Sequence, residues 1–514
     1  MKTTLIPSMK TKTQVVLTSL ILLSVIITLS FSSIYEIPKA WDIERLHSMH
    51  LPYPDTTMVA EPVSEEYYYA LPERVAYKMY PFYMPGKEPQ GYYEKLRQQD
   101  PQIIFNPAQL HSEEDLVKAG EIIYDMPEEY RIMDSTFMAA LPELEKHWAK
   151  FMKTTKEGII PFLSVVVRQK GRIELGLRAC GMCHTKVMPD GSLLKGGQGN
   201  FIFTNFNVSV MKVQRDFYKH SDSIMNARVR AGKRFVFEAP WINHESQERL
   251  KNITLEDWLN FFETTPGVLN RQGSGLGHPT SVPDLFNLKE RKYFDRTGQM
   301  LHRDIGDLMR YATLNQALDM LDDYKGFTPF NRPVNPAKGN FTRISDPQLY
   351  ALSKYIYSLK PPKNPEVYPK GLLKKGEQIF TEQGCVTCHT PPYYSNNKLT
   401  PVDGFEIPKK HFKEYSIFDV SVETDPGLAL YTRRGTGYYK VPSLVGAWNR
   451  TAFLHSGNLA SLEDLFDPKR LEPNYIPTGY KPFWLSHMAV PGHPFGMELN
   501  EKDKTALVAF LKSL

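Results

Sequence analysis

Apolar residues recur at the spacing of an α-helix in two well-separated parts of the chain. In 346–359 and again in 502–514 they follow one another every three or four positions, which places them on one helical face. The segment 112–127 shows a similar pattern and predicts a helix that covers part of the core. Because these patterns have the period of a helix and not of a strand, we expect a mainly α-helical fold.

The first residues of the chain form an apolar run that follows three lysines. Lys2, Lys10 and Lys12 precede the apolar segment 15–31, and positive residues before an apolar run are typical of an export signal. We assign 1–35 as a signal peptide or a membrane anchor, since no small-residue motif marks a clear cleavage site. We therefore expect an exported protein that is periplasmic, or anchored in the membrane and facing the periplasm.

A long stretch of the chain occurs twice. The segment "VPDLFNLKERKYFDRTG" (282–298) aligns without gaps with "VPSLVGAWNRTAFLHSG" (441–457). Both contain V-P-x-L, an arginine, a phenylalanine and a closing glycine. A glycine also stands nine residues before the first cysteine of each half, at Gly171 and Gly376. Repetition of this kind indicates a duplicated structural unit.

The four cysteines of the chain form two C-x-x-C-H motifs. These motifs consist of Cys180, Cys183 and His184 in the first, and Cys385, Cys388 and His389 in the second. A structural zinc site has no need of a histidine after each cysteine pair, and a C-x-x-C disulfide closes too small a loop to stabilise much. Covalent attachment of a c-type haem uses both thiols and takes the histidine as proximal iron ligand. The sequence therefore predicts two covalently bound c-type haems.

The repeats and the motifs together divide the chain into regions. We expect a first cytochrome c domain at 160–362 and a second at 368–514, joined by the Pro/Lys-rich linker 360–370. The first domain carries a long insertion around 205–280, and residues 36–159 form an N-terminal extension. The predicted fold is thus mainly α, with two duplicated cytochrome c-type haem domains and long loops.

Composition and charge narrow the functional classes. The 514 residues are 41% hydrophobic and 23% charged, which is typical of a globular protein with two or three packed units. Lysine and arginine number 62 against 57 acidic residues, and the two signs are interleaved without a long basic run. We therefore expect no nucleic-acid partner.

The two G-x₈-C-x-x-C-H openings and "VPSLVGAWNRTAFLHSGNLASLEDLF" (441–466) resemble the bacterial di-haem cytochrome c peroxidase superfamily. The segments "FLHSGNLASLEDLFDPKR" (453–470) and "PGHPFGMELNEKDKTALVAFLKSL" (491–514) are most similar to its rubber-oxygenase-like branch. The resemblance covers 160–514. It implies one haem that reacts with peroxide or O₂ and a second haem that relays electrons to it. An external donor, such as a small cytochrome or a cupredoxin, would supply those electrons.

The two halves differ at positions that could complete the axial coordination of the iron. A haem with a strong sixth ligand transfers electrons, whereas an open position binds peroxide or O₂. His455 aligns with Arg296 across the repeat, and His493 falls on Lys338 when the halves are counted back from their terminal helices. We therefore expect the first haem to be open. For the second haem we favour His493 over His455 as sixth ligand, and Arg296 is the catalytic candidate, bonded to a propionate or to a bound oxygen species.

The partners of the first haem and the reaction itself stay open among several alternatives. A sixth ligand of the first haem would come from His220, His244, His278 or His302. A distal acid or base for peroxide cleavage would come from Glu238, Glu245 or Glu290. The leading function is reduction of hydrogen peroxide at the first haem with electrons from the second. The alternatives are a rubber-oxygenase-like dioxygenase acting on an apolar substrate, and an electron-transfer cytochrome with both irons six-coordinate.

Overall fold

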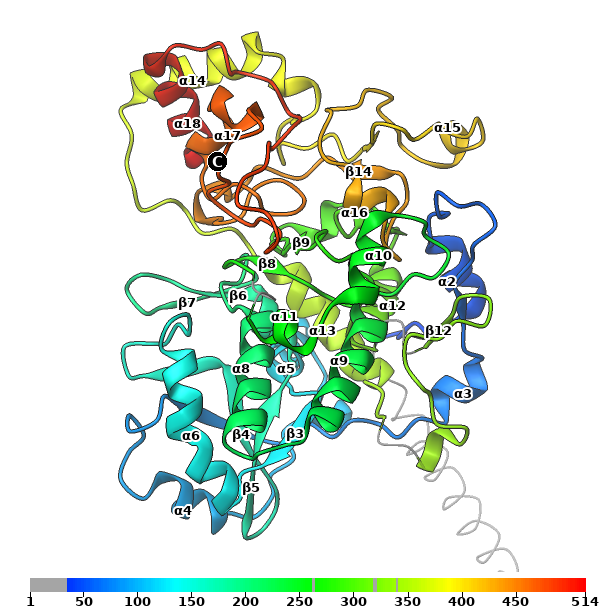
Figure 1. The fold of residues 1–514 in the computed structure, drawn as a ribbon, viewed down its shortest axis with the longest axis vertical. Coiled ribbons are helices and arrows are strands. Elements are labelled where there is room, and N and C mark those ends of the chain that lie inside the picture. Colours follow the sequence, from blue (N-terminus) through cyan, green and yellow to red (C-terminus); the bar gives the residue numbers. More distant parts are fainter. Residues whose placement is uncertain (1–34, 261–263, 318–320, 339–340) are drawn as a thin grey trace, which may run out of the picture.

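The computed structural model describes residues 35–260, 264–317, 321–338 and 341–514 (Figure 1). The predicted signal or anchor lies outside these residues except for its last position. Within the described ranges, no helix combines the length and the apolar character that crossing a membrane requires. More of these residues lie in helices than in strands, and the sheets are small. The prediction of a mainly α-helical protein is therefore confirmed for the secondary-structure content.

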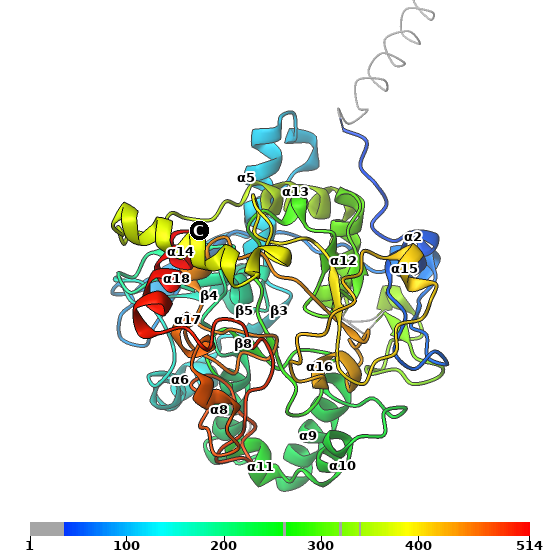
Figure 2. The ribbon, with the colours of Figure 1, turned by 90° about the horizontal axis from the view of Figure 1, so that it is seen from above.

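Two helix pairs carry the predicted helices. Helix α5 (Glu113–Asp125) packs against α13 (Asp346–Ser358), and α14 (Lys370–Glu382) packs against α18 (Glu501–Ser513). The two views in Figures 1 and 2 show each pair side by side. The helices predicted in 346–359, 502–514 and 112–127 are therefore confirmed, and the linker 360–370 has no regular structure before α14 begins.

Each helix pair meets at a glycine. A Cβ atom built on Gly120 of α5 would lie 2.0 Å from the carbonyl oxygen of Ala351, and one built on Gly376 of α14 would lie 2.1 Å from that of Ala506. Distances this short leave no room for a side chain, so glycine permits the backbones to approach closely. In both pairs, a glycine of one helix packs directly against a backbone carbonyl of the other helix.

The sequence predicts that Gly171 and Gly376 are equivalent, but the structure places them in different elements, so this match is wrong. Gly376 lies inside α14, whereas Gly171 lies in the turn before strand β5 (Arg172–Leu177) with a φ of +85° and open space around it. Gly120 is the residue whose packing matches that of Gly376. The spacing to the cysteine misled the alignment because strands separate α5 from the first C-x-x-C-H motif.

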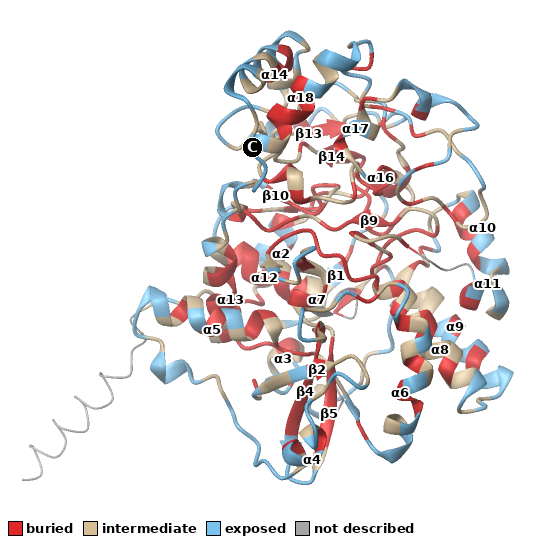
Figure 3. Ribbon diagram, turned by 90° about the vertical axis from the view of Figure 1, so that its left-hand side faces the viewer, coloured by how far each residue is buried: buried red, intermediate tan, exposed pale blue. Residues whose placement is uncertain are grey.

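Those strands form the largest sheet. Its order is β2 (Met79–Tyr83), β4 (Ile159–Gln169), β5 and β3 (Glu129–Ile132), and all neighbours are antiparallel. Strands β4 and β5 are mostly buried, as Figure 3 shows. Helices α6 (Ser135–Trp148) and α8 (Phe203–Asp216) share an apolar core with this sheet. The predicted boundary between 159 and 160 does not coincide with a break, because strands from both sides pair in one sheet.

The N-terminal extension packs into the rest of the molecule. Helices α2 (Ile43–Met49) and α3 (Glu65–Tyr69) belong to one apolar core with α5, α12 (Ile305–Ala317) and α13. Within it the Trp41 ring stacks on Tyr68 with centroids 4.5 Å apart, and the Trp41 indole N–H donates to the carbonyl of Val63. Strand β1 (Glu61–Pro62) pairs with β12 (Asp322–Asp323), and α4 (Tyr92–Arg97) lies near β5.

The predicted insertion around 205–280 is largely helical. Most of α8 lies within it, followed by α9 (Asp222–Val236), α10 (Glu245–Asn252) and α11 (Leu255–Asn260). Buried residues of these helices form a separate cluster around Trp258 and Phe237. The insertion therefore has its own apolar core beside the first C-x-x-C-H motif.

We predict that Gly376→Ala destabilises the protein because the new methyl group overlaps the Ala506 carbonyl. Overpacking of this kind costs about 1–3 kcal/mol, and urea unfolding followed by circular dichroism measures it. Gly371→Ala is the matched control, since Gly371 lies in the same helix and a Cβ atom added there would have nothing within 4 Å. The control should be neutral or stabilising by up to about 1 kcal/mol. Equal effects of the two substitutions would contradict the close-contact interpretation.

Candidate haem-attachment sites

The first C-x-x-C-H motif borders a cavity. The motif forms the short helix α7 (Cys180–His184) directly after β5. Both cysteines and the histidine line a cavity of ≈ 380 Å³, which we call the first-motif cavity. Its lining is rich in apolar and aromatic side chains, among them Met182, Phe203, Val210, Trp258, Phe294 and Tyr311. Thiols, imidazole and an apolar surround fit a covalently attached, planar apolar cofactor.

Backbone carbonyls orient the histidine of each motif. The Nδ1 atom of His184 lies 3.1 Å from the carbonyl oxygen of Pro283. The Nδ1 atom of His389 lies 3.1 Å from the carbonyl oxygen of Tyr394, and the Pro442 carbonyl also bonds this imidazole. When Nδ1–H donates to a carbonyl, Nε2 keeps its lone pair for a metal. Burial lowers the pKa of both imidazoles to about 4, so both are neutral near neutral pH.

Pro283 and Pro442 occupy equivalent positions in the two repeated segments, and the backbone conformation around them repeats as well. The 3₁₀ turns η2 (Leu288–Glu290) and η5 (Ala447–Asn449) follow them at the same offset. Positive φ angles recur at matched positions, which are Asn287 and Gly446, Asp295 and Leu454, and Gly298 and Gly457. The V-P-x-L similarity therefore corresponds to one backbone conformation that presents a carbonyl to each motif histidine.

The arginine of each repeated segment bonds its own V-P-x-L loop. Arg291 donates to the carbonyls of Asp284 and Phe286. Its counterpart Arg450 donates to the carbonyls of Ser443 and Val445, which hold the matching positions. These bonds fix the loops that carry the proline carbonyls.

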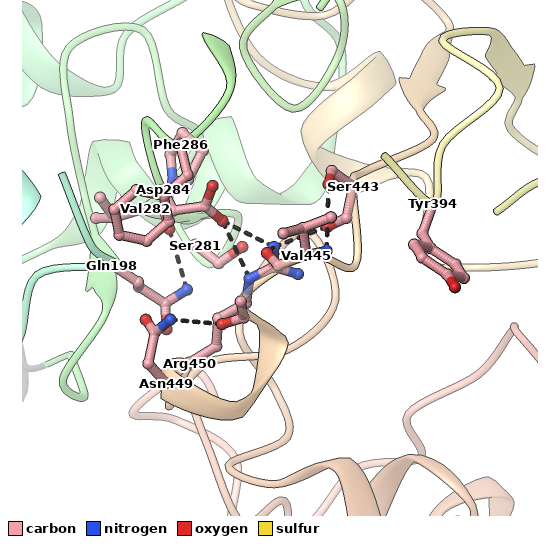
Figure 4. A network of polar contacts seen from close by, with 12 residues as sticks. Gln198, Ser281, Val282, Asp284, Phe286, Tyr394, Ser443, Val445, Asn449 and Arg450 are labelled. Atoms are coloured by element: carbon pink, nitrogen blue, oxygen red, sulfur yellow. Dashed lines mark hydrogen bonds and ion pairs between the residues drawn. The ribbon is translucent and has the colours of Figure 1, made fainter. Parts of the chain in front are cut away.

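A buried carboxylate joins the two loops, as Figure 4 shows. Asp284 lies 2.5 Å from Nη2 of Arg291 and 2.8 Å from Nη2 of Arg450. Burial alone would raise the pKa of Asp284, but the two guanidinium groups hold it at about 2. Beside it the Gln198 amide donates to the carbonyls of Val282 and Ala452, both at 3.0 Å. The two repeated segments are therefore held together by charge and by hydrogen bonds.

A second histidine faces the histidine of the second motif. The His389 and His493 ring centroids lie 6.4 Å apart. Two imidazoles that bind one metal from opposite sides, each with a metal–nitrogen bond of about 2 Å, have centroids roughly 6 Å apart. The Nδ1 atom of His493 is buried and has no hydrogen-bond partner among the described residues. The centroid distance of this pair is therefore close to that of two imidazoles that share a metal.

Arg470 holds the loop that carries His493. Its guanidinium is fully buried and donates to the carbonyls of Val490, Gly492 and His493. His493 itself has a φ of +51°, and its backbone N–H bonds the carbonyl of Val422. The loop is thus fixed from two sides in a conformation that a free chain would rarely adopt.

His455 lies elsewhere, in a cluster with two other histidines. Its ring stacks on Tyr439 at 4.2 Å, and its Nε2 lies 3.6 Å from Oδ1 of Asp425. His278 lies 3.8 Å from the same carboxylate oxygen, and the His244 ring lies 5.6 Å from the His278 ring. In the part of the chain that the structure describes, no group of three or more potential ligands is arranged to hold a bare metal ion.

None of the four histidines considered as a sixth ligand of the first haem lines the first-motif cavity. His244 and His278 belong to the Asp425 cluster, and His220 lines a different cavity beside Tyr218. Both ring nitrogens of His302 are engaged, with the carbonyl of Arg291 and the hydroxyl of Tyr357. Among the described lining residues, His184 is the only histidine.

Arg296 does not line the first-motif cavity either. Its guanidinium bonds the carbonyls of Ser281 and Val282, at 2.9 and 3.3 Å, and it borders a small cavity between the Pro283 and Pro442 loops. Burial lowers its pKa to about 10, so it stays charged near neutral pH. Arg296 thus bonds the backbone just before Pro283, whose carbonyl bonds His184, and does not face the first-motif cavity.

Glu128 is a cavity residue that the sequence did not single out. It lines the first-motif cavity, whereas Glu238, Glu245 and Glu290 do not. Its side chain is 10% exposed, and Oε1 lies 3.6 Å from Nη1 of Arg74. Burial raises the pKa of Glu128 to about 7, against the lowering effect of Arg74 and Arg178. Glu128 follows α5 in a stretch without any motif, so only the fold could identify it.

Comparisons with known proteins find several distant structural similarities. No protein-family model and no curated protein matches the chain. A Kuenenia stuttgartiensis hydrazine synthase, pressurised with xenon, shares 18% identity over 56% of this chain and 87% of its own, with a TM-score of 0.28. A MauG-like protein associated with microbial copper homeostasis shares 15% identity over 49% of this chain and 78% of its own, with a TM-score of 0.29. At TM-scores this low the similarities carry no argument about function.

We predict that Asp284→Asn destabilises the protein by about 3 kcal/mol or more, because two buried guanidinium groups lose their counter-charge. The folded-state pKa of Asp284 is lowered from 3.8 to about 2. Its contribution is therefore complete above pH 3.8 and is lost as the pH falls towards 2. Urea unfolding at several pH values measures this, and the variant should lose part of the acid dependence. Asp100→Asn is the control, since Asp100 is 75% exposed, and a shift beyond about 0.5 kcal/mol is not expected there.

Proposed function

We propose that the protein is an exported di-haem c-type oxidoreductase that reduces hydrogen peroxide at the first motif with electrons relayed through the second. The attachment residues would be Cys180 and Cys183 with His184, and Cys385 and Cys388 with His389. The observation that carries the proposal is the difference between the two sites. The ring of His389 faces His493 at 6.4 Å, whereas His184 borders a cavity with no second histidine among its described lining.

This asymmetry supports different roles for the two sites. Haem, when bound, supplies an iron that transfers electrons if both axial positions are filled and reacts with peroxide or O₂ if one is open. His493 would fill the position opposite His389, and the loop bonded to Arg470 would hold it there. His455 is engaged with Asp425 and Tyr439, which favours His493. An electron carrier without catalysis would need a sixth ligand at the first motif as well.

Glu128 would handle the proton at the first motif. A carboxyl group whose pKa lies near the working pH can both accept and return a proton. The Glu128 pKa of about 7 meets this condition, because burial raises it more strongly than Arg74 and Arg178 lower it. Arg74 and Arg178 would stabilise the ionised carboxylate after the proton has left. Arg296 would act as a structural residue or as a partner of a propionate.

The cofactors would be two covalently bound haems, each with one iron. The proposed partners are a small-molecule oxidant, peroxide or O₂, and an external electron donor such as a small cytochrome or a cupredoxin. We propose no nucleic-acid partner. The proposed location is the periplasm, with the segment 1–35 as cleaved signal or membrane anchor.

We predict two covalent haems per chain and a spectral change that is specific to His493. A pyridine haemochrome assay should give two haems that acid acetone does not extract. His493→Ala should convert one haem to a high-spin spectrum and shift its reduction potential, because axial ligands set haem potentials over a range of about 0.8 V. His455→Ala is the matched control and should leave both spectra unchanged. A single haem, or a silent His493→Ala beside an altered His455→Ala spectrum, would overturn the assignment.

We further predict that Glu128→Gln slows peroxide reduction by about 100-fold or more, because a positioned acid or base contributes about 10²–10⁴ to the rate. The amide cannot titrate, so a transition near pH 7 in the wild-type rate should disappear. Glu143→Gln serves as control, since Glu143 pairs with Lys146 on the surface of α6. Both haem spectra should be retained in each variant. An unchanged rate and pH profile in Glu128→Gln would exclude this role.

A further inference from the structure

A second and larger cavity adjoins the first-motif cavity. Its volume is ≈ 800 Å³, and we call it the arginine-lined cavity. The two cavities share Glu128, Arg178, Gly232 and Phe235 in their walls. The N-terminal extension, α9 and the segments 329–332 and 341–344 supply most of the remaining lining. A molecule in this cavity would therefore lie directly beside the carboxyl group of Glu128.

One wall of the arginine-lined cavity is aromatic. The Phe235 and Phe330 rings meet edge to face with centroids 5.7 Å apart, and Phe330 meets Phe341 in the same manner at 5.2 Å. The side chains of Leu71 and Ile344 extend this apolar surface. Edges and faces of such rings favour another aromatic ring at similar distances. The wall thus suits a flat, apolar body.

The remaining lining is strongly cationic. Six of the lining residues are arginines and two are glutamates. The glutamates are already used, since Glu129 lies 3.2 Å from Nη1 of Arg178 and Glu128 lies 3.6 Å from Nη1 of Arg74. Because both glutamates are paired in this way, the described lining offers no further acidic residue to the other four arginines.

Two of those arginines have buried donors without acceptors. The Nη1 atom of Arg332 and the Nε atom of Arg343 are buried and form no hydrogen bond with described residues. Arg332 pairs with Asp323, at 3.9 Å from Nη2, and Arg343 bonds Glu73 through Nη2. These two atoms are shielded from the cavity as well, so a carboxylate would be attracted by the charge of the Arg332 and Arg343 side chains, both of which line the cavity.

We propose that the arginine-lined cavity binds an organic anion with an aromatic body and one carboxylate. The carboxylate would bond Arg332 and Arg343, and the ring system would pack on the Phe235–Phe330–Phe341 wall. The cavity volume lies within the range of about 300–1,000 Å³ typical of small-molecule sites. Any role of this ligand in the chemistry of the first motif rests on the proposed function, because the two cavities share the wall that contains Glu128. Binding itself depends only on the cavity.

Calorimetric titration of the purified holoprotein tests the proposal with two matched probes. The probes are 2-naphthoate and its neutral analogue 2-naphthylmethanol. We expect naphthoate to bind one per chain and at least about tenfold more tightly than the alcohol, because the charged hydrogen bonds are lost with the neutral group. Equal affinity for the two probes, or no binding of naphthoate, would overturn the proposal.

Variants locate the binding site. Arg332→Gln should weaken naphthoate by about tenfold or more and leave the alcohol unchanged. Ala231→Trp should abolish binding of both probes, because Ala231 is exposed and lines the cavity, where the larger ring would fill the space. Arg215→Gln is the control, since Arg215 pairs with Asp216 on the surface outside this cavity. Naphthoate binding that ignores both Arg332→Gln and Ala231→Trp would place the ligand elsewhere and overturn the proposal.

The haem content of the same sample separates this inference from the proposed function. If two haems are present and naphthoate fails to bind, the ligand site is wrong and the oxidoreductase assignment stands. If naphthoate binds with the expected Arg332 dependence and no covalent haem is found, the ligand site stands and the proposed function fails.

Discussion

The ion pairs of Asp284 with Arg291 and Arg450 are the interaction on which the arrangement of both motifs depends. Asp284 follows Pro283, whose carbonyl bonds His184, and Arg450 fixes the loop that contains Pro442 beside His389. One buried carboxylate therefore links the supports of both motif histidines. Removing this carboxylate would leave the guanidinium groups of Arg291 and Arg450 buried without a counter-charge, which costs stability. If each histidine binds a haem iron, the ion pairs of Asp284 would also hold the two iron sites in a fixed arrangement.

Around this shared support the two sites differ in what faces the histidine. At the second motif His493 approaches His389 on a loop tied to the buried Arg470. At the first motif the insertion helices α8, α9 and α11 leave a cavity, and α5 leads into the chain that places Glu128 in its wall. Repeated loops thus supply the common part of the two sites, and segments present in only one half supply the difference. This difference is the basis of the proposed division between electron transfer at the second motif and chemistry at the first.

The sequence predicted those features that depend on local spacing. Helical periodicity located α13 and α18, and V-P-x-L marked loops whose turns and arginine bonds repeat in the structure. Spacing failed where the chain inserts structure. Gly171 has the same distance to a cysteine as Gly376, but strands intervene, and Gly120 makes the equivalent close contact. Glu128 was missed because its proposed role comes from burial between Arg74, Arg178 and the cavity, and no local pattern encodes burial of a single carboxyl group.

The arginine-lined cavity likewise could not be predicted from the sequence. Its walls come from the N-terminal extension, the insertion and the segments near 330 and 342, which no repeat or motif connects. Each contributing arginine looks like an ordinary surface residue in the sequence, where basic and acidic residues are interleaved. Folding gathers six of them around an aromatic wall while supplying only two glutamates to the described lining. That imbalance of charge would give an anionic ligand an advantage that a neutral one lacks. The non-repeated parts of the chain would thus determine which molecule reaches the first motif.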